Sequence, residues 1–188
     1  YRGYDSAGVG VSIEGESSLV RVRAVGKVAN LEAKVSPLES RVALAGIAHT
    51  RWATHGEPSE NNCHPHADKD NHLFVVHNGI VENYESLRQV LQSRGFEFKS
   101  QTDTEVMAHL IQDTLLNNPE LSLGDAVRIS LTQVEGTFGM AVLSTKFPGT
   151  IVGARRGSPL IVGVGEVSVY FHNSFLLPDK KKYVLTLD

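Results

Sequence analysis

The chain has 188 residues, of which 41% are hydrophobic and 21% charged, and its 18 basic and 21 acidic side chains give a formal net charge of −3. This length suffices for one domain with its own core, and the sequence has neither the basic surplus of a nucleic-acid-binding protein nor an apolar run long enough for a membrane span. Its one cysteine, Cys63, cannot form an internal disulfide, which favours a reducing compartment such as the cytoplasm.

The chain begins with the pattern of a β-hairpin followed by a helix. Apolar residues alternate with small or polar ones over residues 7–13, and residues 19–25 are rich in β-branched side chains. Apolar residues then recur at helical spacing over residues 28–35, just before Pro37, which predicts a short helix.

A predicted strand, a long loop and a second strand follow. Residues 42–48 form a continuous apolar run of strand length, and residues 73–76 form another that leads directly into His77, Asn78 and Gly79. Residues 50–71, between the two runs, are polar and contain two prolines, and we predict a long ordered loop there. Long loops in compact domains are often functional.

Three helices are predicted in the middle of the chain from their N-terminal signals. Asn83 can cap the first helix, whose apolar stripe includes Val90. Thr102 and Glu105 match a capping box, in which each side chain would satisfy a free backbone N–H of the other residue. Ser122 can cap the third helix.

The last part of the chain returns to strand patterns. Turn signals separate apolar runs at residues 140–143, 151–154, 160–164, 167–171 and 183–187. Strands joined by short turns, with the helices grouped between them, predict an α+β fold with largely antiparallel sheets. Because the sequence has no repeat and no linker, we expect one domain.

Six of the eight histidines lie between residues 49 and 77, so this stretch is where we expect the chemistry. Cys63, His64 and His66 offer one thiolate and two imidazoles to a zinc ion, but their spacing suits zinc poorly, and histidines that hydrogen-bond the loop backbone are the alternative. A nucleophilic Cys63 paired with a histidine is supported only by proximity in the sequence. We therefore expect no metal and no cofactor.

Another set of residues suits an α-amino acid as ligand. Arg51 can bind a carboxylate through two parallel hydrogen bonds, and Trp52 can cover the ligand. Asp103, at the start of a predicted helix, suits an ammonium group. The side-chain amide of Asn78 and the backbone N–H of Gly79 can point together at a developing oxyanion. These residues predict a site that attacks the side-chain carbonyl of an α-amino acid.

Each of these residues also has a purely structural interpretation. Arg51 can pair with an internal acid, and Trp52 can lie in the core. Asp103 can be a first-turn acid favoured by the helix dipole, and Asn78 with Gly79 can form a turn. Only their combination with a specific family pattern favours the functional interpretation.

Six segments, in order and with family-like spacing, resemble the glutaminase domain of the glucosamine-6-phosphate synthase family, which belongs to the class II (type 2) glutamine amidotransferases. The segments are residues 1–8, 46–59, 64–66, 77–80, 102–105 and 156–160. The amidophosphoribosyltransferases of the same class share the Arg-aromatic loop and the Asn-Gly pair, but they resemble the first two segments less.

The resemblance implies an N-terminal-nucleophile hydrolase fold, a four-layer sandwich of two antiparallel sheets flanked by helices. In this family an N-terminal cysteine attacks the amide of L-glutamine and releases L-glutamate and ammonia. A sugar-isomerase domain uses the ammonia to convert fructose 6-phosphate to glucosamine 6-phosphate. Residues 1–188 are then a glutaminase domain without its N-terminal nucleophile segment and without the isomerase domain, through which the cytoplasmic enzyme would form a homo-oligomer.

By the same resemblance, Asn78 and Gly79 would form the oxyanion hole, and Arg2 would lie near the nucleophile and orient it. Arg51 would bind the glutamine carboxylate, and Asp103 would bind its amino group.

Trp52, Thr54 and His55 would belong to a loop that closes over the substrate. Two alternatives remain open at this point: a non-catalytic module that binds glutamine or glutamate, and the glutaminase domain of another class II amidotransferase.

Overall fold

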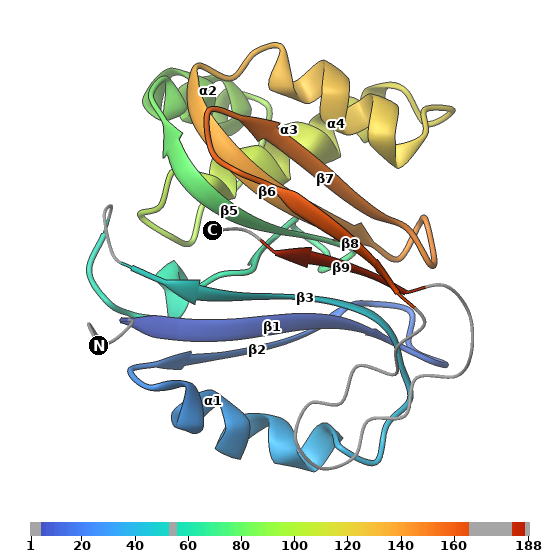
Figure 1. The fold of residues 1–188 in the computed structure, drawn as a ribbon. Helices are drawn as coiled ribbons and strands as arrows, with labels where there is room; N and C mark the ends of the chain where they lie inside the picture. Colours follow the sequence, from blue (N-terminus) through green and yellow to red (C-terminus); the bar gives the residue numbers. More distant parts are fainter. Residues whose placement is uncertain (1–4, 53–55, 166–181, 187–188) are drawn as a thin grey trace.

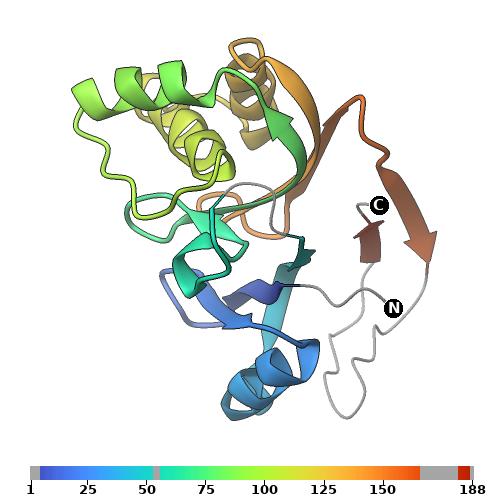
Figure 2. The ribbon, with the colours of Figure 1, turned by 90° about the vertical axis from the view of Figure 1, so that its left-hand side faces the viewer.

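The computed structural model describes residues 5–52, 56–165 and 182–186. These residues form four layers, in which a helix, a first sheet, a second sheet and a group of three helices follow one another (Figure 1). Seen after a quarter turn, the single helix and the group of helices lie at opposite ends of the stack (Figure 2). Both sheets are antiparallel throughout, so the predicted α+β fold with two antiparallel sheets between helices is confirmed.

The first sheet has three strands in the order β2-β1-β3, with one helix beneath it. Its elements are β1 (Ser6–Ile13), β2 (Val20–Val25), β3 (Ala43–Arg51) and the helix α1 (Val28–Val35). β1 and β2 pair as the predicted hairpin. The strand predicted over residues 42–48 runs three residues further, because Ser6 of β1 pairs with Arg51. Arg51 therefore sits at the end of a strand and not in a loop.

The second sheet has four strands in the order β4-β5-β6-β7. They are β4 (His66–Ala67), β5 (Leu73–Val81), β6 (Gly136–Ser144) and β7 (Ile151–Arg156). β5 continues through Asn78 and Gly79, which pair with Gly139 and Phe138 of β6. A turn at Asn78 and Gly79 is therefore excluded. Part of the loop predicted over residues 50–71 is also regular, since it contains the end of β3, β4 and the 3-10 helix η2 (Glu60–Asn62).

Three helices cover the outer face of the second sheet: α2 (Tyr84–Ser93), α3 (Thr104–Asn117) and α4 (Leu123–Leu131). One core cluster fills the space between β5, β6 and these helices and includes Val75, Ile111 and Met140. A second cluster lies between the two sheets and includes Ile47 and Phe74. Because side chains alternate along a strand, neighbouring residues of β5 contribute to different clusters.

Two of the three predicted helix caps are wrong in detail. The side chain of Asn83 does not cap α2; it donates to the carbonyl of Gln133 and accepts from the N–H of Glu135, over 2.8 and 3.0 Å. Val90 lies on the solvent side of α2 and is 47% exposed, although Leu91 beside it is buried. Ser122 does cap α4, since its Oγ accepts from the N–H of Asp125 at 3.1 Å.

The capping box predicted at Thr102 and Glu105 is also not formed. The Glu105 carboxylate accepts instead from the N–H groups of Lys99 and Ser100, over 2.9 and 2.7 Å, and from the Ser100 hydroxyl. Thr102 Oγ1 lies 2.9 Å from His66 Nε2. These side chains thus join the loop before α3 to β4, and α3 begins at Thr104.

The C-terminal part contributes a small antiparallel pair, β8 (Ile161–Gly165) with β9 (Lys182–Thr186). These correspond to the predicted strands at residues 160–164 and 183–187. The predicted strand at residues 167–171 lies outside the described residues. Within the described ranges, none of the helices has the length and apolar character that crossing a membrane requires.

Candidate functional site

Arg51, Asn78, Gly79 and Asp103 lie close together where the end of β3 approaches the second half of β5. Along β5, Phe74 and Val76 face the core between the two sheets, and Asn78 comes next on the same face. On β3, His49 precedes Arg51 by two residues, so both lie on one face of that strand. The two strands are joined there by His49 Nε2 and Asn78 Oδ1, which are 2.6 Å apart.

His49 determines how the Asn78 amide is oriented. Burial lowers the pKa of His49 to about 4, against the opposing effect of its hydrogen bond with Asn78, so the ring is neutral near pH 7. With Nε2 as the protonated nitrogen, the ring donates to Asn78 Oδ1, and the two N–H donors of the Asn78 amide remain free to face a ligand. This role of His49 was not predicted; its position two residues before Arg51 on a strand was the signal that the sequence offered.

Gly79 and Asp103 are brought together along the edge of β5 that faces away from β6. The N–H of His77 donates to His64 Nδ1 at 3.2 Å, and the N–H of Val81 donates to Asp103 Oδ2 at 2.8 Å. Backbone N–H groups two residues apart in a strand point the same way, so the N–H of Gly79 is directed to this side as well. The N–H of Gly79 thus lies between the N–H groups of His77 and Val81, which already have acceptors.

Only glycine fits at position 79. Its φ is 133°, and a Cβ there would lie 2.1 Å from the carbonyl oxygen of Thr137. Any side chain would therefore displace β6, with which Gly79 pairs.

Arg51 and Asp103 provide charges of opposite sign near the Asn78–Gly79 segment. Arg51 is 4% exposed and donates to the carbonyl of Gly56 at 3.4 Å. Burial lowers the pKa of its guanidinium, and the negative charge of Asp103 is among those that oppose this shift. Asp103 is 6% exposed. A buried cation and a buried anion close to the Asn78–Gly79 donors suit a zwitterionic amino acid.

The remaining predicted site residues are placed as follows. Trp52 is 52% exposed, so the interpretation of Trp52 as a core residue is wrong. Arg2, Thr54 and His55 lie outside the described residues.

The residues weighed as a zinc site are used by the fold instead. His64 stacks on His49 with 4.3 Å between ring centroids, and its Nε2 lies 3.3 Å from Thr104 Oγ1. His66 contacts Thr102, and the fully buried Cys63 donates to the carbonyl of Ser59 at 3.1 Å. Over the part of the chain that the structure describes, no three His, Cys, Asp or Glu side chains are arranged to hold a metal ion. The burial of Cys63 also argues against a nucleophilic role.

The neutral His49 predicts a loss of stability in acid. Its folded pKa of about 4 lies below the ordinary value of 6.5, so between these pH values the unfolded chain binds a proton that the folded chain does not. The free energy of unfolding therefore falls as the pH drops below 6.5, by about 1–2 kcal/mol at pH 5 for this residue alone. Urea unfolding at pH 7 and pH 5 should show that His49→Gln removes this part of the loss. An equal loss in both proteins would contradict it.

Comparisons with known proteins agree on one family. Residues 49–172 match the family model described as a glutamine amidotransferase domain. Glutamine–fructose-6-phosphate aminotransferase (isomerizing) of Vibrio vulnificus is 54% identical over 165 residues, which are 88% of this chain and 26% of that protein. The protein of the same name from Salmonella typhi is 45% identical over 188 residues, or 98% of this chain and 30% of that protein. The chain thus spans well under half of the length of these relatives.

Solved structures show a related fold. Glutamine phosphoribosylpyrophosphate amidotransferase from B. subtilis superposes with a TM-score of 0.67 at 27% identity, over 86% of this chain and 34% of that one. A glutamine aminotransferase class-II domain protein from Silicibacter pomeroyi superposes with a TM-score of 0.59 at 20% identity, over 87% of this chain and 76% of that one. At that identity the second likeness concerns the fold alone.

Proposed function

Because the chain belongs to the glutamine amidotransferase domain family, we propose that it is the glutamine-hydrolysing domain of a glutamine–fructose-6-phosphate aminotransferase. It would release ammonia from L-glutamine for the amination of fructose 6-phosphate. The chain is 54% identical to such an aminotransferase and 27% identical to the phosphoribosylpyrophosphate amidotransferase. This difference favours fructose 6-phosphate as the acceptor of the ammonia over the acceptor of the phosphoribosylpyrophosphate enzyme.

The observation that carries the proposal is the convergence of three elements on one small region. β3 supplies Arg51, the start of α3 supplies Asp103, and β5 supplies Asn78 and Gly79 between them. The hydrogen bonds from His49 to Asn78 and from Val81 to Asp103 connect these elements directly. The arrangement suits the α-carboxylate, the α-ammonium and the side-chain carbonyl of one glutamine molecule.

In the proposed reaction, Arg51 holds the α-carboxylate of glutamine and Asp103 its ammonium group. Attack on the side-chain amide carbon places negative charge on the amide oxygen, and the Asn78 amide and the Gly79 N–H donate to that oxygen. Donors already oriented in the folded protein stabilise such a charge without reorganisation. Cys63 is buried and donates a hydrogen bond to the carbonyl of Ser59. We therefore assign the attack to the N-terminal cysteine that the family resemblance implies.

The proposal extends to residues and partners outside the described geometry. Trp52, Thr54 and His55 would close over the bound glutamine, and Arg2 would orient the nucleophile. The ammonia would pass to a sugar-isomerase domain in a cytoplasmic homo-oligomer. The share of its relatives' length that the chain covers, 26%, supports such a further domain.

Replacing Asp103 with asparagine should remove the preference for a ligand that carries an amino group. We expect the intact protein to bind L-glutamate more tightly than glutarate, which lacks only the α-ammonium group. A hydrogen bond to a charged group contributes about 1.5–3 kcal/mol. Asp103→Asn should therefore weaken the binding of L-glutamate by about ten- to a hundredfold and leave the binding of glutarate nearly unchanged. Calorimetric titration with both ligands measures the difference.

The matched control is Asp125→Asn, the same change on the exposed face of α4. It should leave both affinities unchanged. Equal binding of glutarate and L-glutamate by the unaltered protein would contradict the role of Asp103. Binding of neither ligand would contradict the proposed function as a whole.

A further inference from the structure

A second group of charged side chains surrounds a small cavity that shares no residue with the glutamine site. The cavity has a volume of about 120 Å³ and lies between β2, the segment from Asn61 to Asn71 and α3. Four basic side chains line it: Arg21 and Arg23 of β2, Lys69, and Lys99. A cavity of this size has room for a small ion but not for a nucleotide.

Arg21 and Arg23 form one wall of the cavity. They are two residues apart on β2 and so lie on the same face of the strand. Arg21 donates to the carbonyl of Pro65 at 3.3 Å, and Arg23 donates to those of Cys63 and Asn61 at 3.1 and 3.3 Å. Neither takes part in any of the ion pairs found among the described residues.

The charge of Arg23 disfavours the charged form of Arg21, while the carboxylates of Glu105 and Asp68 favour it. Burial lowers the pKa of Arg21 to about 10, and the neighbouring charge of Arg23 acts in the same direction. An anion bound between them would oppose the effect of Arg23 on Arg21 and would add a charged acceptor to the backbone carbonyl oxygens that the two guanidinium groups already bind.

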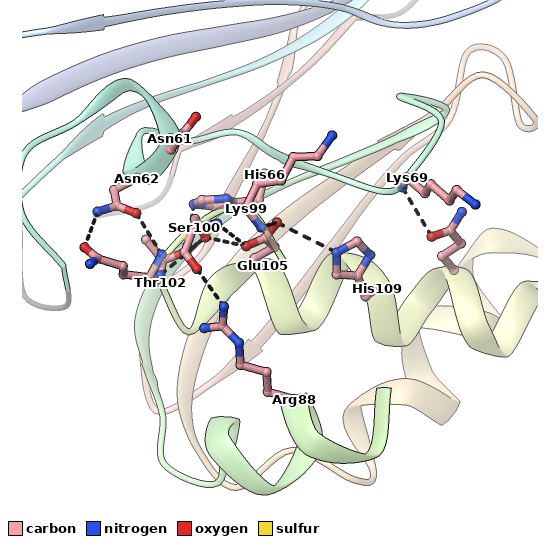
Figure 3. A network of polar contacts seen from close by, with 12 residues as sticks. Asn61, Asn62, His66, Lys69, Arg88, Lys99, Ser100, Thr102, Glu105 and His109 are labelled. Carbon is pink, nitrogen blue, oxygen red and sulfur yellow. Dashed lines mark hydrogen bonds and ion pairs between the residues drawn. The ribbon is translucent and has the colours of Figure 1, made fainter. Parts of the chain in front are cut away.

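His109 forms the opposite wall. It is 2% exposed on α3, packed against Phe96 and Phe98 with ring-centroid distances of 5.3 and 4.7 Å. Neither of its ring nitrogens has a hydrogen-bond partner among the described residues. His109 Nε2 faces the Glu105 carboxylate, whose Oε1 lies 3.8 Å away in a long ion-pair contact (Figure 3). With Nε2 directed at Glu105, Nδ1 is the buried ring nitrogen that can take a ligand as its hydrogen-bond partner.

Three carboxylates in the lining, those of Asp68, Glu97 and Glu105, limit which anion can enter. Asp68 accepts from the N–H groups of His72 and Leu73 over 2.7 and 3.0 Å. Burial raises the pKa of Glu105, but its partner His109 and the donors of Lys99 and Ser100 outweigh burial and lower that pKa to about 2. Asp68 and Glu105 are thus held as acceptors by the fold. Sulfate would meet them only as like charges, whereas hydrogen phosphate carries an O–H that can donate to a carboxylate.

We propose that this cavity binds a phosphate group, held by Arg21, Arg23 and His109, with Lys69 and Lys99 at its mouth. The ligand is free hydrogen phosphate or the phosphate of a small monoester, since both present the same acceptors and the same O–H. The site does not depend on the proposed glutaminase function, because its lining includes none of Arg51, Asn78, Gly79 and Asp103.

The test is calorimetric titration of the intact protein with sodium phosphate, sodium sulfate and glucose 6-phosphate at constant ionic strength. Phosphate should bind and sulfate should not. Because Arg21→Gln removes a charged hydrogen-bond donor, it should weaken phosphate binding by about tenfold or more. Phosphate sites elsewhere in the protein remain in both forms, so the heat lost with Arg21→Gln belongs to this cavity. An Arg21-dependent heat with glucose 6-phosphate as well would identify a monoester site.

Two further variants keep the test decisive if Arg21→Gln unfolds. Lys99→Gln changes an exposed side chain of the lining and should weaken phosphate binding without changing the melting temperature. Arg128→Gln removes the same charge from the exposed face of α4, outside the cavity, and should have no effect. Equal affinities for sulfate and phosphate would overturn the proposal. An equal loss of phosphate affinity in Lys99→Gln and Arg128→Gln would do the same.

Discussion

Replacing Asn78 with alanine is expected to lower kcat for glutamine hydrolysis by about a hundred- to a thousandfold, with little change in KM. The reason is that the Asn78 amide would donate to an oxygen that becomes negative only during attack, so its loss affects the transition state more than the bound substrate. Release of glutamate by the intact protein, followed under saturating and limiting glutamine, separates kcat from KM.

A comparison along the same strand separates this effect from damage to β5. Ile80, two residues further on the same face, is 44% exposed, and Ile80→Ala should change kcat only slightly. His49→Gln should have an intermediate effect, because the glutamine amide can still donate to Asn78 Oδ1 and so keep part of the orientation that His49 provides. If Asn78→Ala kept its full kcat, or changed only KM, Asn78 would not be a donor to the oxyanion.

The second large effect is expected at Arg51. Replacement by alanine would leave the ligand carboxylate without its partner in a region where Arg51 itself is 4% exposed. Truncating one member of a buried charged pair costs about 2–5 kcal/mol, so the Kd for L-glutamate should rise by about thirtyfold to several thousandfold. Calorimetric titration of the intact protein with L-glutamate checks this directly.

Two variants control for the change of charge and for folding. Arg155→Ala removes an exposed guanidinium from β7 and should leave the Kd unchanged. Arg51→Lys keeps the charge but loses the paired donors, so binding should be intermediate. A Kd unaffected by Arg51→Ala, in a protein whose melting temperature is also unaffected, would remove Arg51 from the carboxylate site.

The sequence by itself determined the order and type of the longer secondary-structure elements, but not the short β4 and η2 within the predicted loop. Hydrophobic alternation located the hairpin and the buried strands, and helical spacing together with the Ser122 cap located helices, because these patterns depend on residues close together in the chain. The residue types needed for an amino-acid site, such as Arg51 and Asp103, were also readable. Their identification as a set rested on the family resemblance.

Only the tertiary structure decided which of these residues meet. Asn83 and Glu105 do not form the predicted caps, because their side chains hydrogen-bond to other segments instead. A local sequence pattern does not predict such partners. The contact of His49 with Asn78 spans 29 residues of sequence, and that of Val81 with Asp103 spans 22. Both arise because the two sheets pack face to face and α3 begins beside the edge of β5. Packing of distant elements, and not periodicity, therefore sets the geometry of the proposed site.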